Sequence, residues 1–214
     1  MAPKSSAPAT PMLPDFFLDW WFAPWTYAAP EPGHLPAATD RVGQHDGYRL
    51  WCAQAGVAAD FQAGFDAAWH VAATTQGPDL LAAAALFGGL IVAREAEQSM
   101  LAQLALADRR WCMSIAMTQP LKAQAQPAPA AVKGIEIRGL LELAGWLEPA
   151  FPGVWPRLRL LLSPATVVAV DTALETSVSG AGAELSASAR ARRCWTHCRD
   201  RVLARKNAEF QMAA

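Results

Sequence analysis

The stretch LLAAAALFGGLIVA, residues 80–93, decides the fold of this chain. Apolar residues fall on every face that a helix would present, which is typical of a helix buried on all sides. Pro78 and Asp79 precede the run, and both residue types suit a first helical turn. At ~1.5 Å per residue the run spans about 21 Å, short of the ~30 Å hydrocarbon core of a bilayer. We therefore predict the central helix of a packed protein core.

Gly88 and Gly89 lie inside this run. Each glycine costs roughly 1 kcal/mol relative to alanine in a helix interior. Two arrangements would account for the pair. Either a neighbouring helix approaches closely at this point, or the central helix kinks there.

Other segments also carry helical spacing, so we predict an all-α fold, a compact irregular domain of about six to eight helices. Phe61, Phe65 and Trp69 recur at i, i+4 and i+8, which predicts an amphipathic helix over residues 58–74. Further helices are expected over 135–147, where Pro149 ends the segment, and over 184–206. Residues 155–162 fit a helix or a strand, and the β-branched stretch 167–170 allows one minor strand pair.

Composition sets the boundaries of the domain. Residues 1–14 are rich in Pro, Ala and Ser, so we expect a disordered tail. The helical domain is predicted over 15–206, with a Pro/Gly-rich loop over 28–47 and a Pro/Ala-rich linker near 119–132. Residues 207–214 are expected to form a frayed C-terminus.

Composition also excludes several classes of protein. Hydrophobic residues make up 53 % of the 214 residues and charged residues only 17 %, which excludes a wholly disordered chain. A pI near 6.4 excludes a uniformly basic nucleic-acid binder. Four cysteines are too few for a disulfide-stapled module, and no signal peptide is evident, so we expect a cytoplasmic protein with buried, reduced thiols.

The sequence shows no catalytic, metal or cofactor motif, and we predict that the protein is not an enzyme. Cys194, His197 and Cys198 lack the second pair of ligands that a structural zinc site needs. Neither a nucleophile elbow nor a glycine-rich phosphate loop is present. An enzyme whose site is assembled from distant residues, with His45 or His70 as its base, stays open as an alternative.

The strongest charge feature is the last predicted helix. Residues 186–206 hold seven Arg and Lys against one Asp, a net +6, so the rest of the chain carries −7 of the total charge of −1. At 100° per residue, Arg190, Arg193 and Arg201 lie opposite Trp195. Trp195 should therefore lie in a packed stripe and the arginines on a basic outer face. This face either balances the acidic body or forms a docking surface for a partner protein.

A dense aromatic segment runs from Phe16 to Tyr27. Its rings either fix a short helix in the core or form an exposed anchor for a partner or a membrane surface. On the second interpretation, Trp20, Trp21 and Trp25 are the candidate contact residues. Burial of these rings in the isolated chain would exclude it.

Several stretches resemble the SctK family (OrgA/MxiK/YscK-like), accessory proteins of bacterial type III secretion. FAPWTY (22–27) followed by LP (35–36) resembles an F-x-P-x-x-Y…L-P signature. LFGGLI (86–91) resembles the family's apolar helix with glycine. IRGL (137–140), Trp146, Pro149 and WPRLRL (155–160) resemble a later G-L…W…R-L-x-L-x-L-P block, although Ser163 intervenes before the final proline. The resemblance covers residues 15–165.

The resemblance implies a non-enzymatic adaptor in the cytosolic sorting platform of a secretion apparatus. Such a protein bridges the cytoplasmic domain of the SctD-type inner-membrane ring protein to the SctQ-type pod protein. It would be cytoplasmic, and associated with the cytosolic face of the inner membrane only through its partners. No nucleic acid and no small-molecule substrate are expected. The alternative is a helical nucleic-acid-binding regulator that uses the basic C-terminal helix.

Overall fold

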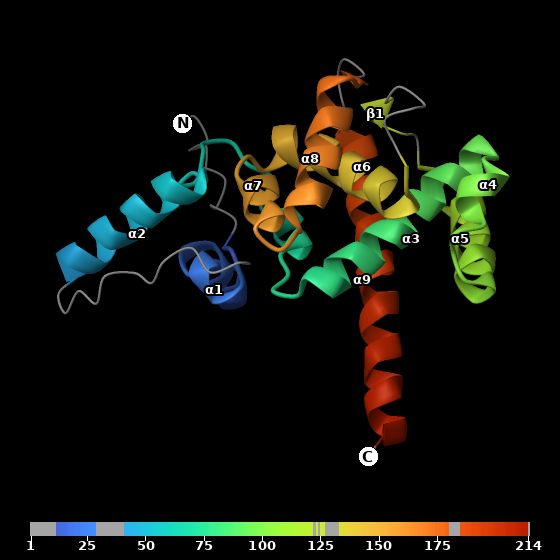
Figure 1. Cartoon of the computed structure of the whole chain (residues 1–214), viewed down its shortest axis with the longest axis horizontal. Helices are drawn as coiled ribbons and strands as arrows, with labels where there is room; N and C mark the ends of the chain where they lie inside the picture. The colour runs from blue at the N-terminus through green and yellow to red at the C-terminus, as the bar shows by residue number, and fades with distance from the viewer. Residues whose placement is uncertain are drawn as a thin grey trace, which may run out of the picture.

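The computed structural model (Figure 1) describes residues 12–28, 41–121, 123, 125–126, 133–179 and 185–213. The α-helices of these residues are α1 (Asp15–Phe22), α2 (Arg41–Ala55), α3 (Gly77–Glu95), α4 (Gln98–Leu101), α5 (Leu106–Thr118), α6 (Ile135–Ala150), α7 (Val154–Arg159), α8 (Pro164–Glu175) and α9 (Leu185–Ala213). The 3-10 helices are η1 (Pro24–Thr26) and η2 (Ala67–Ala72). Two-residue strands, β1 (Ala125–Gln126) and β2 (Val178–Ser179), pair antiparallel. The all-α prediction is confirmed, with one helix more than expected because short α4 and α7 are separate.

The predicted central helix is α3, and it lies at the centre of the core. Its buried residues include the unbroken stretch 86–92. Helices α5, α6 and α9 pack around it (Figure 1). Length and composition alone would let α3 cross a membrane, but in this fold its apolar surface is covered by neighbouring helices.

Glycines allow α3 and α6 to approach each other at backbone distance. A Cβ atom added to Gly139 would overlap the carbonyl oxygen of Ala84, and one added to Gly88 would overlap that of Ile135. Of the two explanations for glycine inside the central helix, close approach of a neighbouring helix is therefore confirmed. The contact offsets the roughly 1 kcal/mol that each glycine costs.

The helix predicted over 58–74 is wrong. Only the six residues of η2 are helical there, and the preceding segment runs through bends and turns. Gly64 has a φ of +80°, which a right-handed helix does not allow. The rings of Phe61, Phe65 and Trp69 still pack on the main core. Their spacing matches a helix although the backbone is largely irregular.

Several boundaries also differ from the prediction. Residues 167–170 lie in α8, so the strand pair is elsewhere, and residues 155–159 are helical in α7. Helix α2 begins within the predicted loop, α6 continues through Pro149 to Ala150, and α9 continues to Ala213 instead of fraying after 206. Residues 1–11 of the predicted tail, most of the predicted linker and residues 35–36 of the first signature lie outside the described residues.

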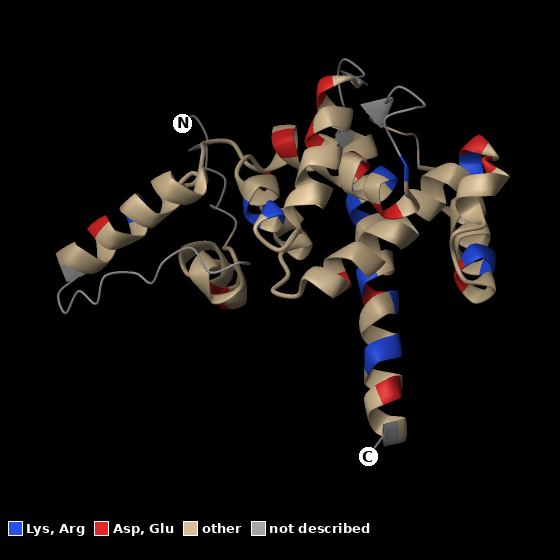
Figure 2. Ribbon diagram, in the orientation of Figure 1, with Lys and Arg blue, Asp and Glu red and all other residues tan. Residues whose placement is uncertain are grey.

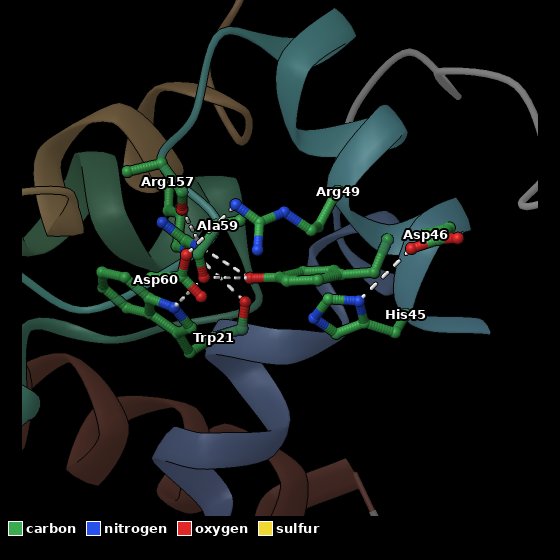
Figure 3. A network of polar contacts seen from close by, with 9 residues as sticks. Trp21, His45, Asp46, Arg49, Ala59, Asp60 and Arg157 are labelled. Carbon is green, nitrogen blue, oxygen red and sulfur yellow. Dashed lines mark hydrogen bonds and ion pairs between the residues drawn. The ribbon is translucent and has the colours of Figure 1, made fainter. Parts of the chain in front are cut away.

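Arg157 of α7 joins the N-terminal helices to the body. Its side chain is fully buried, and its guanidinium group lies 3.5 Å from the centre of the Trp21 ring. Nε donates to the Trp21 carbonyl at 3.2 Å, while Nη2 donates to the Tyr48 hydroxyl at 3.1 Å and to the Ala58 carbonyl at 2.7 Å. Figure 3 shows these groups converging from α1, α2, α7 and the segment with Ala59. One side chain thus holds four segments.

Candidate partner interface on the C-terminal helix

Helix α9 forms because a regular apolar stripe packs against α3 and η2. The stripe consists of residues no more than 8 % exposed: Ala191, Cys194, Trp195, Cys198 and Val202. Their spacing of three or four residues places them on one helical face. The Trp195 ring meets Phe87 of α3 edge to face, with ring centres 5.6 Å apart. The predicted packed stripe on this helix is confirmed.

Figure 2 shows Lys and Arg along α9, and most of these residues form ion pairs within the molecule. Arg192 pairs with Asp66 at 2.7 Å, and Lys206 pairs with Asp79 at 2.8 Å. Arg201 and Arg205 both pair with Asp108 of α5, at 2.9 Å and 2.7 Å. The charge that the sequence places on this helix therefore attaches it to the acidic body.

The three arginines predicted to form a docking face differ in their surroundings. Arg201 is not free: besides its ion pair, its guanidinium carbon lies 5.0 Å from the centre of the Trp111 ring. Arg190 is half-buried and donates to the Pro120 carbonyl at 3.1 Å. Among the described residues, Arg193 is exposed and makes no ion pair or hydrogen bond. Arg201 is therefore engaged within the molecule and Arg193 is exposed, while docking of a partner at the three arginines stays a prediction.

The last turns of α9 extend beyond the body (Figure 1). Large apolar side chains on this part are exposed: Leu203 by 41 %, Phe210 by 77 % and Met212 by 81 %. Leu203 and Phe210 are seven residues apart, so they lie on the same side of the helix. We call this part, residues 203–213, the projecting end of α9. The sequence analysis missed it, although the heptad spacing of these two residues was a usable signal.

A second exposed apolar surface lies on α5. Leu106, Met113 and Met117 are exposed by 57 %, 48 % and 84 %. Their spacing of seven and four residues places them on one side of α5, opposite the buried Asp108 and Cys112 that face the core. We call this the α5 stripe. The exposed Arg110 lies between Leu106 and Met113 on this side. Large apolar side chains exposed at helical spacing are typical of a helix-binding surface.

The exposed-anchor interpretation of the aromatic segment fails for two of its three tryptophans. Trp21 is fully buried and Trp20 is 4 % exposed. Their indole N–H groups donate to the carbonyls of Ala59 at 3.1 Å and of Thr74 at 2.7 Å, respectively. Trp25 is half-buried and meets Trp51 of α2 edge to face. The rings serve mainly to fix α1 on the core.

The remaining candidate groups are placed apart. No group of three or more metal-ligating side chains is found among the residues that the structure describes. His45 lies on α2, 3.5 Å from Asp46, whereas the Nδ1 of His70 lies 3.0 Å from the Ala67 carbonyl. Asp66, four residues before His70, caps η2 by accepting from the Ala68 N–H at 3.0 Å.

All four cysteines are free and buried, as predicted. Burial raises the pKa of the Cys112 thiol to about 12 and that of the Cys194 thiol to about 11. The pKa values of Cys52 and Cys198 are also raised by burial. These thiols are therefore protonated at neutral pH and pack as small apolar groups.

No family model, curated protein or solved structure matches this chain.

Proposed function

We propose that this protein is a non-enzymatic adaptor that holds two partner proteins on separate surfaces. The observation that carries the proposal is the pair of unpartnered apolar surfaces, the projecting end of α9 and the α5 stripe. Large apolar side chains exposed at helical spacing on a well-packed domain are typical of surfaces that bind another protein. The two lie on different helices, and the α5 stripe faces away from the side of α5 that meets α9.

The tightly packed core supports this role, because a protein that bridges two partners must hold them at a fixed relative position. Close backbone contact between α3 and α6 and the single buried guanidinium of Arg157 tie the segments into one body. A rigid body keeps two partners at a fixed separation and orientation. Both partner surfaces are helical, which suits docking of a helix into a groove of each partner.

The sequence resemblance makes the proposal specific. On that basis the protein is an SctK-like component of a type III secretion sorting platform. Its partners are then the cytoplasmic domain of an SctD-type ring protein and an SctQ-type pod protein, at the cytosolic face of the inner membrane. The internal ion pairs of α9 weaken the nucleic-acid alternative, because they neutralise the cations that would contact phosphates.

Affinity purification of the tagged chain from its native cells, with mass identification of partners, tests the proposal. Phe210→Glu and Met117→Glu place a charge on one surface each. We expect each variant to lose a different partner while keeping the other. Val168→Glu is the matched control, since Val168 is 64 % exposed on α8 outside both surfaces. Retention of all partners by both variants would contradict the proposal, as would the absence of any secretion component among them.

A further inference from the structure

The outer side of α1 carries exposed aromatic rings with a carboxylate between them. Phe16 and Phe22 are exposed by 54 % and 43 %, and Asp19 is exposed as well. Spacings of three residues place Asp19 between the two rings on one side of the helix. Met12, which is 96 % exposed, lies four residues before Phe16. We call these four residues the α1 stripe.

The α5 stripe has the same arrangement around a charge of opposite sign. Arg110 lies four residues after Leu106 and three residues before Met113, and all three are exposed. Among the described residues, neither Arg110 nor Asp19 forms an ion pair or a side-chain hydrogen bond. An unpaired charge between exposed apolar side chains favours a partner that places the opposite charge between apolar side chains of its own.

The two stripes match each other when the helices run antiparallel. With Asp19 opposite Arg110, each apolar residue of one stripe meets an apolar residue of the other. The pairs are Phe22 with Leu106, Phe16 with Met113, and Met12 with Met117. At ~1.5 Å per residue, the two rings of the α1 stripe are about 9 Å apart along the helix and their counterparts on α5 about 10.5 Å apart. The spacing of apolar groups and the charges are therefore both complementary.

We infer that the α1 stripe of one copy of this protein binds the α5 stripe of a second copy. Helices α1 and α5 lie far apart on opposite sides of the body (Figure 1), so one chain cannot bring its own two stripes together. The contact joins two copies head to tail and leaves one stripe of each kind free. A contact of this kind repeats, and it produces open chains or closed rings.

The size of the contact sets its expected strength. Three apolar side chains from each copy and one ion pair form an interface smaller than those of stable complexes, which bury about 1,200–2,000 Å². Small interfaces are typical of weak, transient association. We therefore expect a dissociation constant between about 10 µM and 1 mM.

This inference goes beyond the proposed function and does not rest on it. The adaptor proposal makes no use of the α1 stripe, whereas the α5 stripe is common to both. A second copy and a different protein cannot occupy the α5 stripe at the same time. Self-association therefore withholds this stripe from the partner that the adaptor proposal assigns to it.

The first test measures mass by analytical ultracentrifugation of the full chain, over the same range of about 10 µM to 1 mM. We expect the average mass to rise with concentration beyond twice the chain mass of 22.9 kDa. Phe16→Glu alters only the α1 stripe and Met113→Glu only the α5 stripe, and each variant alone should stay monomeric. An equimolar mixture should form dimers and nothing larger, because each variant keeps one intact stripe. Val168→Glu, 64 % exposed and outside both stripes, should behave like the unaltered chain.

The second test exchanges the charges of the central pair. Asp19→Arg and Arg110→Asp should each weaken self-association roughly tenfold or more, because each places like charges opposite one another. The double variant, Asp19→Arg with Arg110→Asp, should return to within about threefold of the unaltered chain, since the pair is restored with its signs reversed. Both residues are exposed, so neither change disturbs the core, and thermal unfolding checks this.

The outcomes separate this inference from the proposed function. A chain that stays monomeric over the whole range would overturn the inference, as would self-association that Phe16→Glu and Met113→Glu leave unchanged. A double charge variant that associates no better than the single variants would overturn the antiparallel pairing. Asp19→Arg should lose self-association and still capture both secretion partners. Partner capture by a chain that does not self-associate would remove this inference and leave the adaptor, and self-association of a chain that captures no secretion component would do the reverse.

Discussion

Replacing Arg157 by methionine should destabilise the protein by about 3 kcal/mol. The side chain is fully buried, and no carboxylate pairs with it among the described residues. Burial lowers the pKa of Arg157, because the surroundings are apolar apart from carbonyl and hydroxyl groups. A buried charge held only by neutral acceptors depends on all of those hydrogen bonds together.

The magnitude follows from the groups that methionine would leave behind. The buried carbonyl of Trp21 loses its donor, at about 1–3 kcal/mol for a buried unsatisfied group. The carbonyl of Ala58, an exposed residue, loses less because water can replace the donor. Loss of the contact with the Trp21 ring adds about 1–2 kcal/mol. Removal of the desolvated charge offsets part of this sum. The Tyr48 hydroxyl costs little, because it still donates to the Ala59 carbonyl at 2.7 Å.

Urea unfolding followed by far-UV circular dichroism measures the free energy of unfolding and its dependence on urea. Arg159→Met is the matched control, since Arg159 lies on the same helix with its side chain 38 % exposed and pairs with Asp171. An exposed pair of this kind contributes about 0–1 kcal/mol. A loss below about 1 kcal/mol in Arg157→Met, with an unchanged urea dependence, would refute the role given to this residue.

Three further predictions concern the core and α9. Gly139→Ala should lower the free energy of unfolding by about 2–3 kcal/mol in thermal unfolding, because its Cβ would overlap the Ala84 carbonyl. Gly134→Ala is the control and should lose less, because its Cβ would meet only the movable Glu136 side chain. Equal losses in the two variants would contradict this prediction. Asp108→Asn should lower the free energy of unfolding by about 2 kcal/mol, because it removes the charge that pairs with Arg201 and Arg205. A change within about 0.5 kcal/mol, the size expected for a surface substitution, would count against this prediction. The thiol of Cys112 has its pKa raised to about 12 and that of Cys194 to about 11, so both keep their protons in the folded state above the ordinary thiol pKa of 9.0 and release them on unfolding. Stability should therefore fall as pH rises above about 9, by about 1 kcal/mol for each thiol at pH 10, and a flat profile from pH 8 to 10 in chemical unfolding would contradict it.

The sequence predicts those elements whose residue pattern is compatible with only one kind of structure. An apolar run such as residues 80–93 can only be buried, so α3 was predictable, and glycine inside it indicated the close approach of α6. The stripe containing Trp195 was predictable for the same reason. Residues 58–66 were not, because Phe61 and Phe65 match a helical spacing while the carbonyls of Ala58 and Ala59 are held by side chains from other elements. These are Arg157 and Trp21, which lie 99 and 38 residues away in the sequence, and Tyr48 of α2.

The sequence predicts a candidate interface on α9 from its charges, whereas the structure leaves apolar side chains exposed near the end of the same helix. Counting charges identifies α9 as basic, but it does not show which cations are already paired. Arg192 and Lys206 find their acids 126 and 127 residues away in the sequence. Only the packing of α9 across the body brings these charges together, and no local pattern encodes that packing.

The three aspartates that form ion pairs with α9 each lie at the start of a helix in the body. Their placement fixes α9 along the body and leaves its last residues without such a pair. Asp66 is the N-cap of η2, Asp79 lies in the first turn of α3, and Asp108 lies in the first turn of α5. Each therefore stabilises the start of its own helix and also pairs with a cation of α9. Because these pairs end at Lys206, no described ion pair holds α9 beyond that point. Phe210 and Met212 lie beyond Lys206, so the most exposed apolar residues of the projecting end come after the last ion pair with the body.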